Sequence, residues 1–445
     1  EGAWDVPATG LSSTNGGTSH EAMILGLRSA RAYAFLPMAT DSGTGAVGVA
    51  STIARTTGPR PTKIPPMLVT ARDPARMEPG VTMFNLATNT FRGIVAVDDA
   101  GELVWYLESP DIFAPTDVRR LADGNFLALS NDLPLNTAAV EFDPLGATVR
   151  VWKASDLGVD DFHHEVSEMP NGNLLALSTE LRSIGGYPGD QTYNVVGDLI
   201  VEFTRDGDVA NEVHLHDLLD PYRVLFDSDF GLNFWEIRYG VEVRDWTHGN
   251  AIVYDPTDDT YVYSSRHQDI IAKVTRAEPH TLVWVIGQDA EVSSADDAWP
   301  FLAYKLTDVG ISHQHAPQLL PNGRILIYDN GNIRGLTRVV EYQIDPVNRF
   351  AVQTWQWFDT DYSPPIFAPS VGDADMLPGG TVLVCDGGIV PDPFNPFRGN
   401  YTRIAEVTRA TSEKVFELII RDESEELENR TSYRAERLPS LYPPE

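Results

Sequence analysis

Three of the ten histidines in the chain stand at the same position of a recurring sequence unit, and an arginine follows one of them. His164, His248 and His315 each open a copy of the unit, and Arg266 comes 18 residues after His248, the length of one β-hairpin. A guanidinium offers paired N–H donors to an anionic group, and an imidazole near neutral pH can act as nucleophile, base or acid. Together they would suit a tetrahedral oxyanion. Attack by an imidazole nitrogen would form a covalent intermediate and divide a group transfer into two steps.

The same histidines could instead form a metal site or have a purely structural role. Three imidazoles can bind zinc or copper. However, a nearby Arg266 disfavours a cation and favours an anion. Other copies of the unit hold Thr116 and Gly372 at the same position, so the fold does not itself require histidine there. We therefore expect a catalytic pocket with no metal and no cofactor, and we keep the metalloenzyme as an alternative.

Further candidate residues stand beside this set and on two long insertions. The insertions, 217–246 and 288–312, are rich in aromatic residues and run directly into a histidine. Long loops in a compact repeat protein are often binding loops, although such loops can also only pack over the fold. Aromatic side chains there, including Trp235, could sandwich an aromatic ring. The predicted substrate-binding residues are Trp246, Asn250, His163, His313, Trp299 and Phe230.

The recurring unit predicts how these residues come together. Copies such as HEVSEMPNGNLLALS from His164 and HAPQLLPNGRILIYD from His315 contain a Pro-Asn-Gly turn before an apolar strand, and two further alternating strands follow each copy. The copies begin 48, 84, 67 and 57 residues apart. Five four-strand units and one partial unit at 94–108 predict an all-β fold, a six-bladed β-propeller, in which equivalent positions face one central channel. A β-solenoid is the main alternative.

The repeat also divides the chain. Residues 1–60 are expected to form a small, partial fibronectin type III-like or immunoglobulin-like β-sandwich. Residues 61–75 are expected to be a linker, since the segment around 56–66 is rich in proline. The propeller would occupy residues 76–445. Its first blade lacks a strand, and the tail 432–443 is a candidate to complete it.

Composition limits the partners. The net charge of -31 argues against nucleic acid or an anionic membrane as partner. No run of apolar residues is long enough to span a bilayer. Cys385 is the single cysteine, so no intrachain disulfide can form. No signal peptide is visible at Glu1, which fits either cytosolic origin or prior removal.

The sequence around these residues resembles the bacterial arylsulfotransferases that do not use the nucleotide sulfate donor. The resemblance lies in DWTHGNAIVYDPTDDTYVYSSRHQDIIAKV (245–274), HQHAPQLLPNGRILIYDNGN (313–332), FHHEVSEMPNGNLLALS (162–178) and SYRAERL (432–438). It implies a six-bladed propeller behind a β-sandwich. It also implies sulfuryl transfer from an aryl sulfate to a phenol by a ping-pong route through a sulfohistidine.

The resemblance assigns roles to single residues. It implies that His315 becomes sulfated, that His248 and Arg266 hold the sulfuryl oxygens, and that His164 completes the pocket. It also implies a periplasmic or secreted protein whose signal peptide has been removed. The front sandwich is short here, and the single Cys385 departs from relatives that carry a disulfide.

A third hypothesis is a non-catalytic adhesion or assembly module. The open edge of a partial sandwich could pair with another subunit, so a homo-oligomer is a further expectation.

Overall fold

The computed structural model is built mainly of β-strands, which confirms the predicted all-β class. It describes residues 12–14, 19–21, 23–41, 43–132, 136–187, 191–225, 234–287, 303–392, 394–424 and 427–443. The helical elements in these ranges are short: α1 (Ala154–Leu157), the 3-10 turn η2 (Leu215–Asp217) and α2 (Phe234–Tyr239). No helix among the described residues has the length and apolar character needed to cross a membrane.

From residue 81 onward the strands form six antiparallel units of four strands, and neighbours in a unit follow one another in sequence in five of them. The Pro-Asn-Gly turns explain the local pairing, because Gly172 takes a left-handed φ of 84° that lets the chain reverse. The second unit contains β11 (Val118–Arg120), β12 (Phe126–Asp132), β13 (Asn136–Phe142) and β14 (Thr148–Lys153), and the third contains β15 (His163–Glu168), β16 (Leu174–Tyr187), β17 (Gln191–Phe203) and β18 (Val209–His214).

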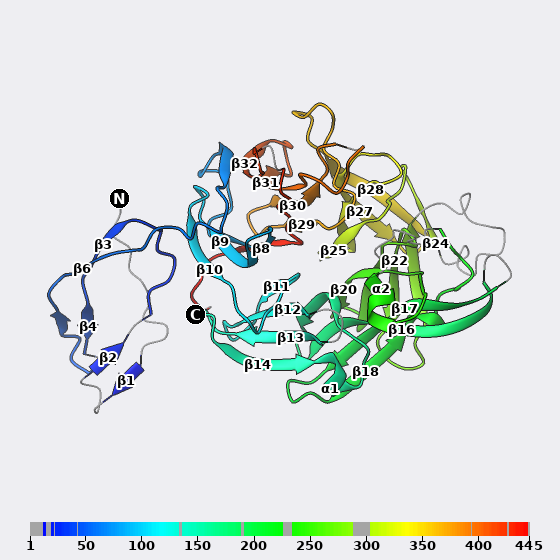
Figure 1. Cartoon of the computed structure of the whole chain (residues 1–445), viewed down its shortest axis with the longest axis horizontal. Coiled ribbons are helices and arrows are strands. Elements are labelled where there is room, and N and C mark those ends of the chain that lie inside the picture. The colour runs from blue at the N-terminus through cyan, green and yellow to red at the C-terminus, as the bar shows by residue number, and fades with distance from the viewer. Residues whose placement is uncertain are drawn as a thin grey trace.

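The remaining units continue the same pattern round the molecule (Figure 1). The fourth contains β20 (Gly249–Asp255), β21 (Thr260–Ser265), β22 (Ile270–Thr275) and β23 (Leu282–Gly287). The fifth contains β25 (His315–Leu320), β26 (Arg324–Asp329), β27 (Arg338–Asp345) and β28 (Phe350–Trp357). The sixth contains β29 (Asp373–Met376), β30 (Thr381–Ile389), β31 (Tyr401–Thr408) and β32 (Lys414–Ile420).

The first unit is assembled from both ends of this region. β8 (Val81–Ala87), β9 (Arg92–Val97) and β10 (Leu103–Leu107) are consecutive, and β33 (Ala435–Leu438) pairs antiparallel with β8. The tail therefore supplies the missing strand, as the sequence predicted. The partial unit expected at 94–108 also gains β8 upstream.

Three short strands add to the units. β19 (Arg244–Asp245) pairs with β17, and β24 (Ala303–Leu306) lies between β23 and β28 and joins the fourth unit to the fifth. β7 (Leu68–Arg72) pairs with β32. The linker predicted at 61–75 was thus wrong for Leu68–Arg72, because five alternating residues are too short a pattern to distinguish an edge strand from a connection.

Six apolar clusters lie between successive units and connect the sixth back to the first. The fourth cluster in ring order, for example, packs Ile271 of β22 against Ile325 of β26. The last joins Phe84 of β8 to Leu383 of β30. The other four clusters bridge the first and second, second and third, third and fourth, and fifth and sixth units. Contacts between β15 and β20, between β20 and β25, and between β25 and β29 bring the leading strands of the units together.

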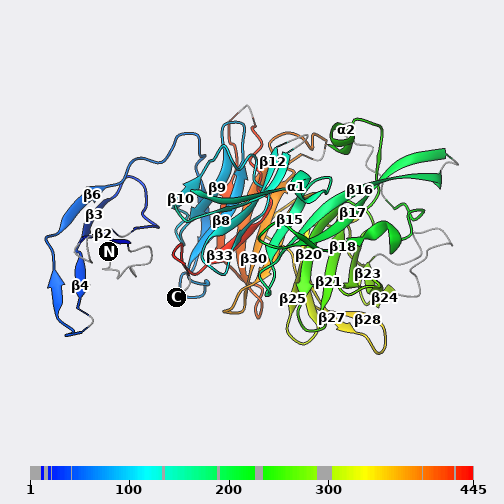
Figure 2. The same ribbon diagram turned by 90° about the horizontal axis from the view of Figure 1, so that it is seen from below.

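The described residues before 60 form three separate two-stranded pairs that extend away from this body (Figure 2). The Leu25 N–H donates to the Tyr442 hydroxyl over 2.7 Å, and Arg28 pairs with Asp98, so the body holds one end of the segment. The pairs are β1 (Ser12–Thr14) with β2 (Ser19–Glu21), β3 (Ala32–Phe35) with β6 (Ile53–Thr56), and β4 (Met38–Thr40) with β5 (Val47–Val49).

Candidate active site

The strands that carry the aligned histidines are irregular where the histidines stand. A bulge interrupts β15 between His163 and Val166, and another interrupts β25 after His315. The backbone is left-handed at His164, with a φ of 60°, and at His248, with a φ of 47°. Bulges and left-handed residues turn side chains away from strand alternation and are frequent beside functional sites. The local backbone therefore determines the direction in which these rings point.

The three aligned histidines lie together: His248 is beside His164, and both His164 and His315 are beside Tyr433 of the C-terminal tail. The ring centroid of His164 lies 5.0 Å from that of His248 and 5.8 Å from that of Tyr433. The ring of His315 lies 6.3 Å from the same tyrosine. Arg266 belongs to this group, since its backbone N–H donates to the His248 carbonyl over 3.2 Å. The four predicted catalytic residues are thus neighbours in space.

Arg266 supplies positive charge to this group of side chains, which we call the pocket. Its side chain is held in part by the Pro369 carbonyl, which accepts from Nη2 over 3.1 Å. Burial lowers the pKa of Arg266 to about 10, although Asp245 and Asp269 oppose that change. The guanidinium therefore remains charged at neutral pH and offers the pocket a binding group for an anion.

His315 is held as a neutral ring of defined tautomer. Its Nδ1 lies 2.7 Å from Asn330 Oδ1, and the Asn330 amide nitrogen donates to the carbonyls of Ala368 and Val371. Those two bonds orient the amide so that Oδ1 faces the ring, which means that His315 Nδ1 carries the proton and Nε2 the lone pair. Burial, followed by the charge of Arg266, lowers the pKa of His315 well below its ordinary value of 6.5.

His248 is paired with an ionised carboxylate. Its Nδ1 lies 2.6 Å from Asp245 Oδ2. Burial alone would raise the pKa of Asp245, but His248, His267 and Arg266 hold it well below its usual range. Asp245 therefore accepts a hydrogen bond from the Nδ1–H of His248, which leaves Nε2 for the pocket.

Asp245, His248 and His267 form the one group of potential metal ligands found among the described residues, with ligand atoms within 4.8 Å of one another. This set differs from the predicted trio of aligned histidines, of which it contains one. Hydrogen bonds already explain its geometry, since His267 Nδ1 lies 2.7 Å from the Asp245 carbonyl and His248 Nδ1 lies on the carboxylate. The arrangement favours a hydrogen-bonded pair over a metal centre.

Two predicted substrate-binding residues serve instead to position the backbone. Asn250 donates from Nδ2 to the Gln314 carbonyl over 2.7 Å, directly before His315. His313 Nδ1 lies 2.9 Å from Asp269 Oδ1. These residues fix the segment that carries His315.

The prediction that Trp246 contacts substrate was wrong. Its side chain is 0% exposed, stacks on His216 at 5.1 Å and donates from Nε1 to the Arg223 carbonyl. Proximity to His248 in sequence did not reveal that the ring points into the apolar core. Trp235 is also buried, edge-on to His163 at 5.3 Å. Phe230 and Trp299 lie outside the described residues.

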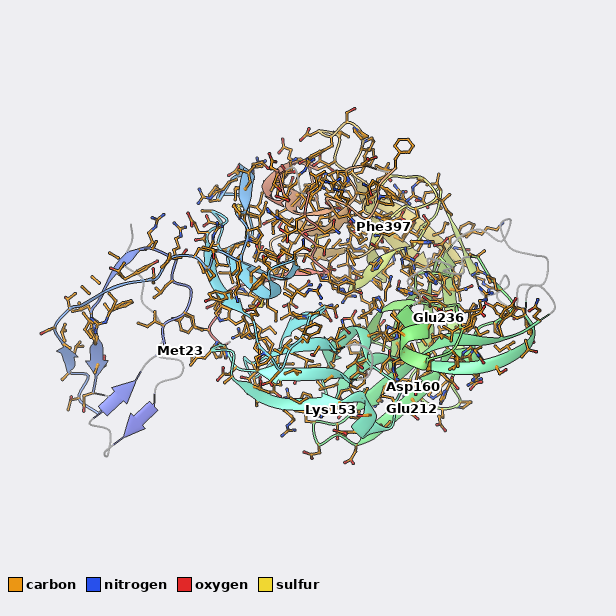
Figure 3. The ribbon with its side chains drawn as sticks, viewed as in Figure 1. Met23, Lys153, Asp160, Glu212, Glu236 and Phe397 are labelled. Carbon is orange, nitrogen blue, oxygen red and sulfur yellow. The ribbon has the colours of Figure 1, made fainter. Side chains whose placement is uncertain are left out.

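The helix α2 belongs to the first insertion and covers the outer end of the third unit. Trp235 of α2 packs with Val196 of β17 and Val243. The Tyr239 hydroxyl lies 2.7 Å from Thr179 Oγ1 and 2.9 Å from Asp160 Oδ2. Figure 3 labels Glu236 on this helix and Asp160 close to it. The insertion thus packs against the third unit and against His163.

Tyr433 and Arg434 are pocket residues that our sequence reasoning missed. Arg434 Nη1 lies 2.5 Å from Glu165 Oε2, and its Nη2 donates to the Asn250 carbonyl over 2.9 Å. The Tyr433 hydroxyl donates to that same carbonyl over 3.0 Å. The available signal was the tail itself, because a strand that completes the first unit must also face the centre.

Two curated relatives are 26% identical to this chain where they align. They are arylsulfate sulfotransferase AssT of Escherichia coli O6:H1, aligned over 345 residues, and the protein of the same name from Lelliottia amnigena, aligned over 346 residues. Each alignment covers 62% of this chain and 54% of the relative, so the chain spans about half the length of these proteins.

A putative 6-phosphogluconolactonase from Bacteroides uniformis is among the similar solved structures, with a TM-score of 0.41 and 13% identity over 76% of this chain and 82% of that chain. The family model described as arylsulfotransferase (ASST) matches residues 68–434, which include every residue of the pocket. The chain therefore belongs to the arylsulfotransferase family.

Proposed function

We propose that this protein is an aryl sulfotransferase that moves a sulfuryl group from an aryl sulfate to a phenolic acceptor through a sulfohistidine at His315. The observation that carries the proposal is the neutral His315, whose Nδ1–H is anchored on Asn330 so that Nε2 holds a lone pair beside Arg266. Membership of the family supports it, since the curated relatives carry the name arylsulfate sulfotransferase.

In the first step, His315 Nε2 attacks sulfur and the bond from sulfur to the aryl oxygen breaks. The aryl oxygen leaves with the electron pair. Arg266 and His164 hold the sulfuryl oxygens, where charge must be stabilised as the group transfers. In this proposal His164 takes the role that the resemblance implied for His248, because His248 is paired with Asp245. His248, with Nδ1–H on Asp245, donates the Nε2 proton that the leaving phenolate takes.

In the second step, the acceptor phenol returns a proton to His248 Nε2 as its oxygen attacks sulfur. The bond from sulfur to His315 Nε2 breaks, and the electron pair returns to the imidazole. The Asn330 amide holds the same ring in both steps, so donor and acceptor use one pocket in turn. This sequence is a ping-pong reaction.

We infer that the six units are blades of a β-propeller. The six shared apolar clusters, the last of which joins the sixth unit to the first, support this inference, as does the closing strand β33. A central channel would then explain why residues from β15, β20 and β25 meet. The front segment would be the later part of a fibronectin type III-like sandwich.

The direct test is incubation with 4-nitrophenyl sulfate and phenol. We expect release of nitrophenol that depends on phenol, and a mass increase of about 80 Da, one SO3 group, on the peptide that contains His315. His280→Gln, on the β22–β23 turn, is the matched control and should behave as wild type. Absence of both signals would contradict the proposal and favour a non-catalytic module.

The acid side of the pH profile should reflect the environment of His315. Because its pKa lies well below 6.5, the nucleophile stays unprotonated as the pH falls through that value. We expect kcat/KM for the donor to persist below pH 6.5 and to decline only at lower pH. Steady-state rates across the acid range measure this. A decline centred at 6.5 would show that His315 titrates as an ordinary histidine.

A further inference from the structure

We propose that His163 is a positioning residue: a buried imidazolium that donates to His164 and thereby holds His164 as a hydrogen-bond donor toward the pocket. No sulfuryl oxygen touches His163 in this scheme. Its catalytic consequence rests on the proposed sulfuryl transfer, but its protonation and the tautomer of His164 can be measured in the resting protein.

The two adjacent rings share one proton position. His163 Nδ1 lies 2.8 Å from His164 Nδ1, and the rings stand at 89° to each other. The other nitrogen of His163, Nε2, lies 3.1 Å from the Ser178 carbonyl and 3.2 Å from Asp198 Oδ1. Both of these groups are acceptors, so Nε2 of His163 must carry a proton. The proton between the two Nδ1 atoms could be bonded to either ring.

Asp198 favours a proton bonded to Nδ1 of His163 rather than to Nδ1 of His164. Its Oδ2 accepts from the Gly249 N–H and the Tyr263 hydroxyl, which leaves Oδ1 for His163. Burial would raise the pKa of Asp198, but His163 and the hydroxyl donors keep it below its usual value. A buried carboxylate of this kind needs a cationic partner.

The other groups around His163 support the same charge state. Burial opposes its ionisation, yet the hydrogen bond and charge of Asp198, with Asp161, raise the pKa of His163 to about 9. Trp235 of α2 packs edge-on against the ring at 5.3 Å and contributes no charge. The side chain is 3% exposed, so water does not replace these partners.

His164 is neutral, in contrast to the charged His163. Burial, then His248, His163 and His315, lowers its pKa well below 6.5, so it stays neutral. Since its Nδ1 accepts from His163, its single proton is on Nε2, on the side of the ring away from His163. The ring of His164 lies beside those of His248 and Tyr433, so this Nε2–H is available among the pocket residues.

The pocket therefore contains two neutral histidines of opposite tautomer. His315 presents a lone pair at Nε2, and His164 presents Nε2–H. Only His315 can act as nucleophile, whereas His164 can donate to a sulfuryl oxygen. The cation on His163 strengthens that donor and adds to the positive charge of Arg266 in a chain whose net charge is -31.

The first experiment is 15N NMR of the histidine rings in full-length protein with labelled histidine, without substrate. We expect both nitrogens of His163 to be protonated up to about pH 9, and His164 to be protonated at Nε2 alone. His163→Asn and His164→Asn assign the signals. His214→Gln, which removes another histidine beside a carboxylate, Glu180, is the control and should change neither signal. A neutral His163 at pH 7 would overturn the proposal, whether or not the protein transfers sulfuryl groups.

The second experiment follows the burst of nitrophenol release, which reports the first step without an acceptor. His163→Leu removes donor and charge, and we expect its burst rate to fall by about 10- to 100-fold. His163→Asn keeps an N–H donor for His164 Nδ1 without the charge, so its rate should lie between those of wild type and His163→Leu.

The pH profile separates this role from a structural one. In wild type the burst rate should decline as His163 loses its charge near pH 9, and His163→Asn should lack that decline. Thermal unfolding of each variant shows whether the fold persists. A folded His163→Leu with the wild-type burst rate would overturn the proposal.

Discussion

Replacing His315 by glutamine is expected to abolish sulfuryl transfer while the protein remains folded. The variant keeps a polar side chain of similar length but has no nitrogen lone pair that can attack sulfur. We expect kcat/KM for the donor to fall by about 10⁴-fold or more, as for other covalent nucleophiles. The nitrophenol assay measures the rate, and mass spectrometry should find no sulfated peptide.

A second variant tests why His315 is the nucleophile. Asn330→Leu removes the acceptor for Nδ1–H, so the ring can place its proton on either nitrogen and can rotate. Its activity should fall less than that of His315→Gln, and the sulfated peptide should still form slowly. His280→Gln again serves as control. A sulfated peptide in His315→Gln would show that another histidine is the nucleophile.

The repeat was sufficient to predict the pocket residues that occupy equivalent positions. His164, His248 and His315 occur at one slot of an aligned unit, so their convergence follows from the symmetry of the units rather than from any local propensity. Arg266 followed from the length of one hairpin. The same logic would have placed Tyr433, had the tail been aligned as a leading strand.

Residues that act through a hydrogen bond were not predictable in the same way. Asp245 lies on the short strand β19 and Asn330 directly follows β26, and the repeat does not specify that either of them reaches a pocket histidine. Trp246 shows the converse error, because a residue two positions before His248 faces the core, while the left-handed backbone at His248 turns the histidine ring elsewhere. The strand β7 escaped notice because its edge position leaves it a short and weakly patterned stretch.

The strand that closes the ring should be the most sensitive element of the fold, and Arg434 is the residue that tests it. Arg434 lies next to β33 and pairs with Glu165 on β15, near Asp117, while its Nη2 holds the Asn250 carbonyl on β20. The side chains of Arg434 and Glu165 are each 4% exposed. Without Arg434, the buried carboxylates of Glu165 and Asp117 would share one cation, Arg119, which lies 2.9 Å and 3.2 Å from them. Arg434→Met therefore leaves buried negative charge in excess and should destabilise the protein by about 3–5 kcal/mol.

The pH dependence of that loss identifies its cause. Burial already raises the pKa of Glu165 above its ordinary 4.5, and without Arg434 the carboxyl should take up its proton even more readily. A group with a raised pKa contributes its stability at low pH and loses it as the pH rises through the folded-state value. Arg434→Met should therefore lose more stability at pH 8 than at pH 5, as thermal unfolding at about these two values would show.

A double variant that also removes the charge of Glu165 supplies the matched comparison for Arg434→Met. Arg434→Met combined with Glu165→Gln should recover part of the stability, because one buried carboxylate, Asp117, then faces one guanidinium, Arg119. Arg31→Met, which removes an exposed arginine from the front segment, should change stability by less than about 1 kcal/mol. If the double variant were no more stable than Arg434→Met at pH 8, Arg434 would stabilise the ring through its contact with the Asn250 carbonyl and its packing, and not through the ion pair with β15.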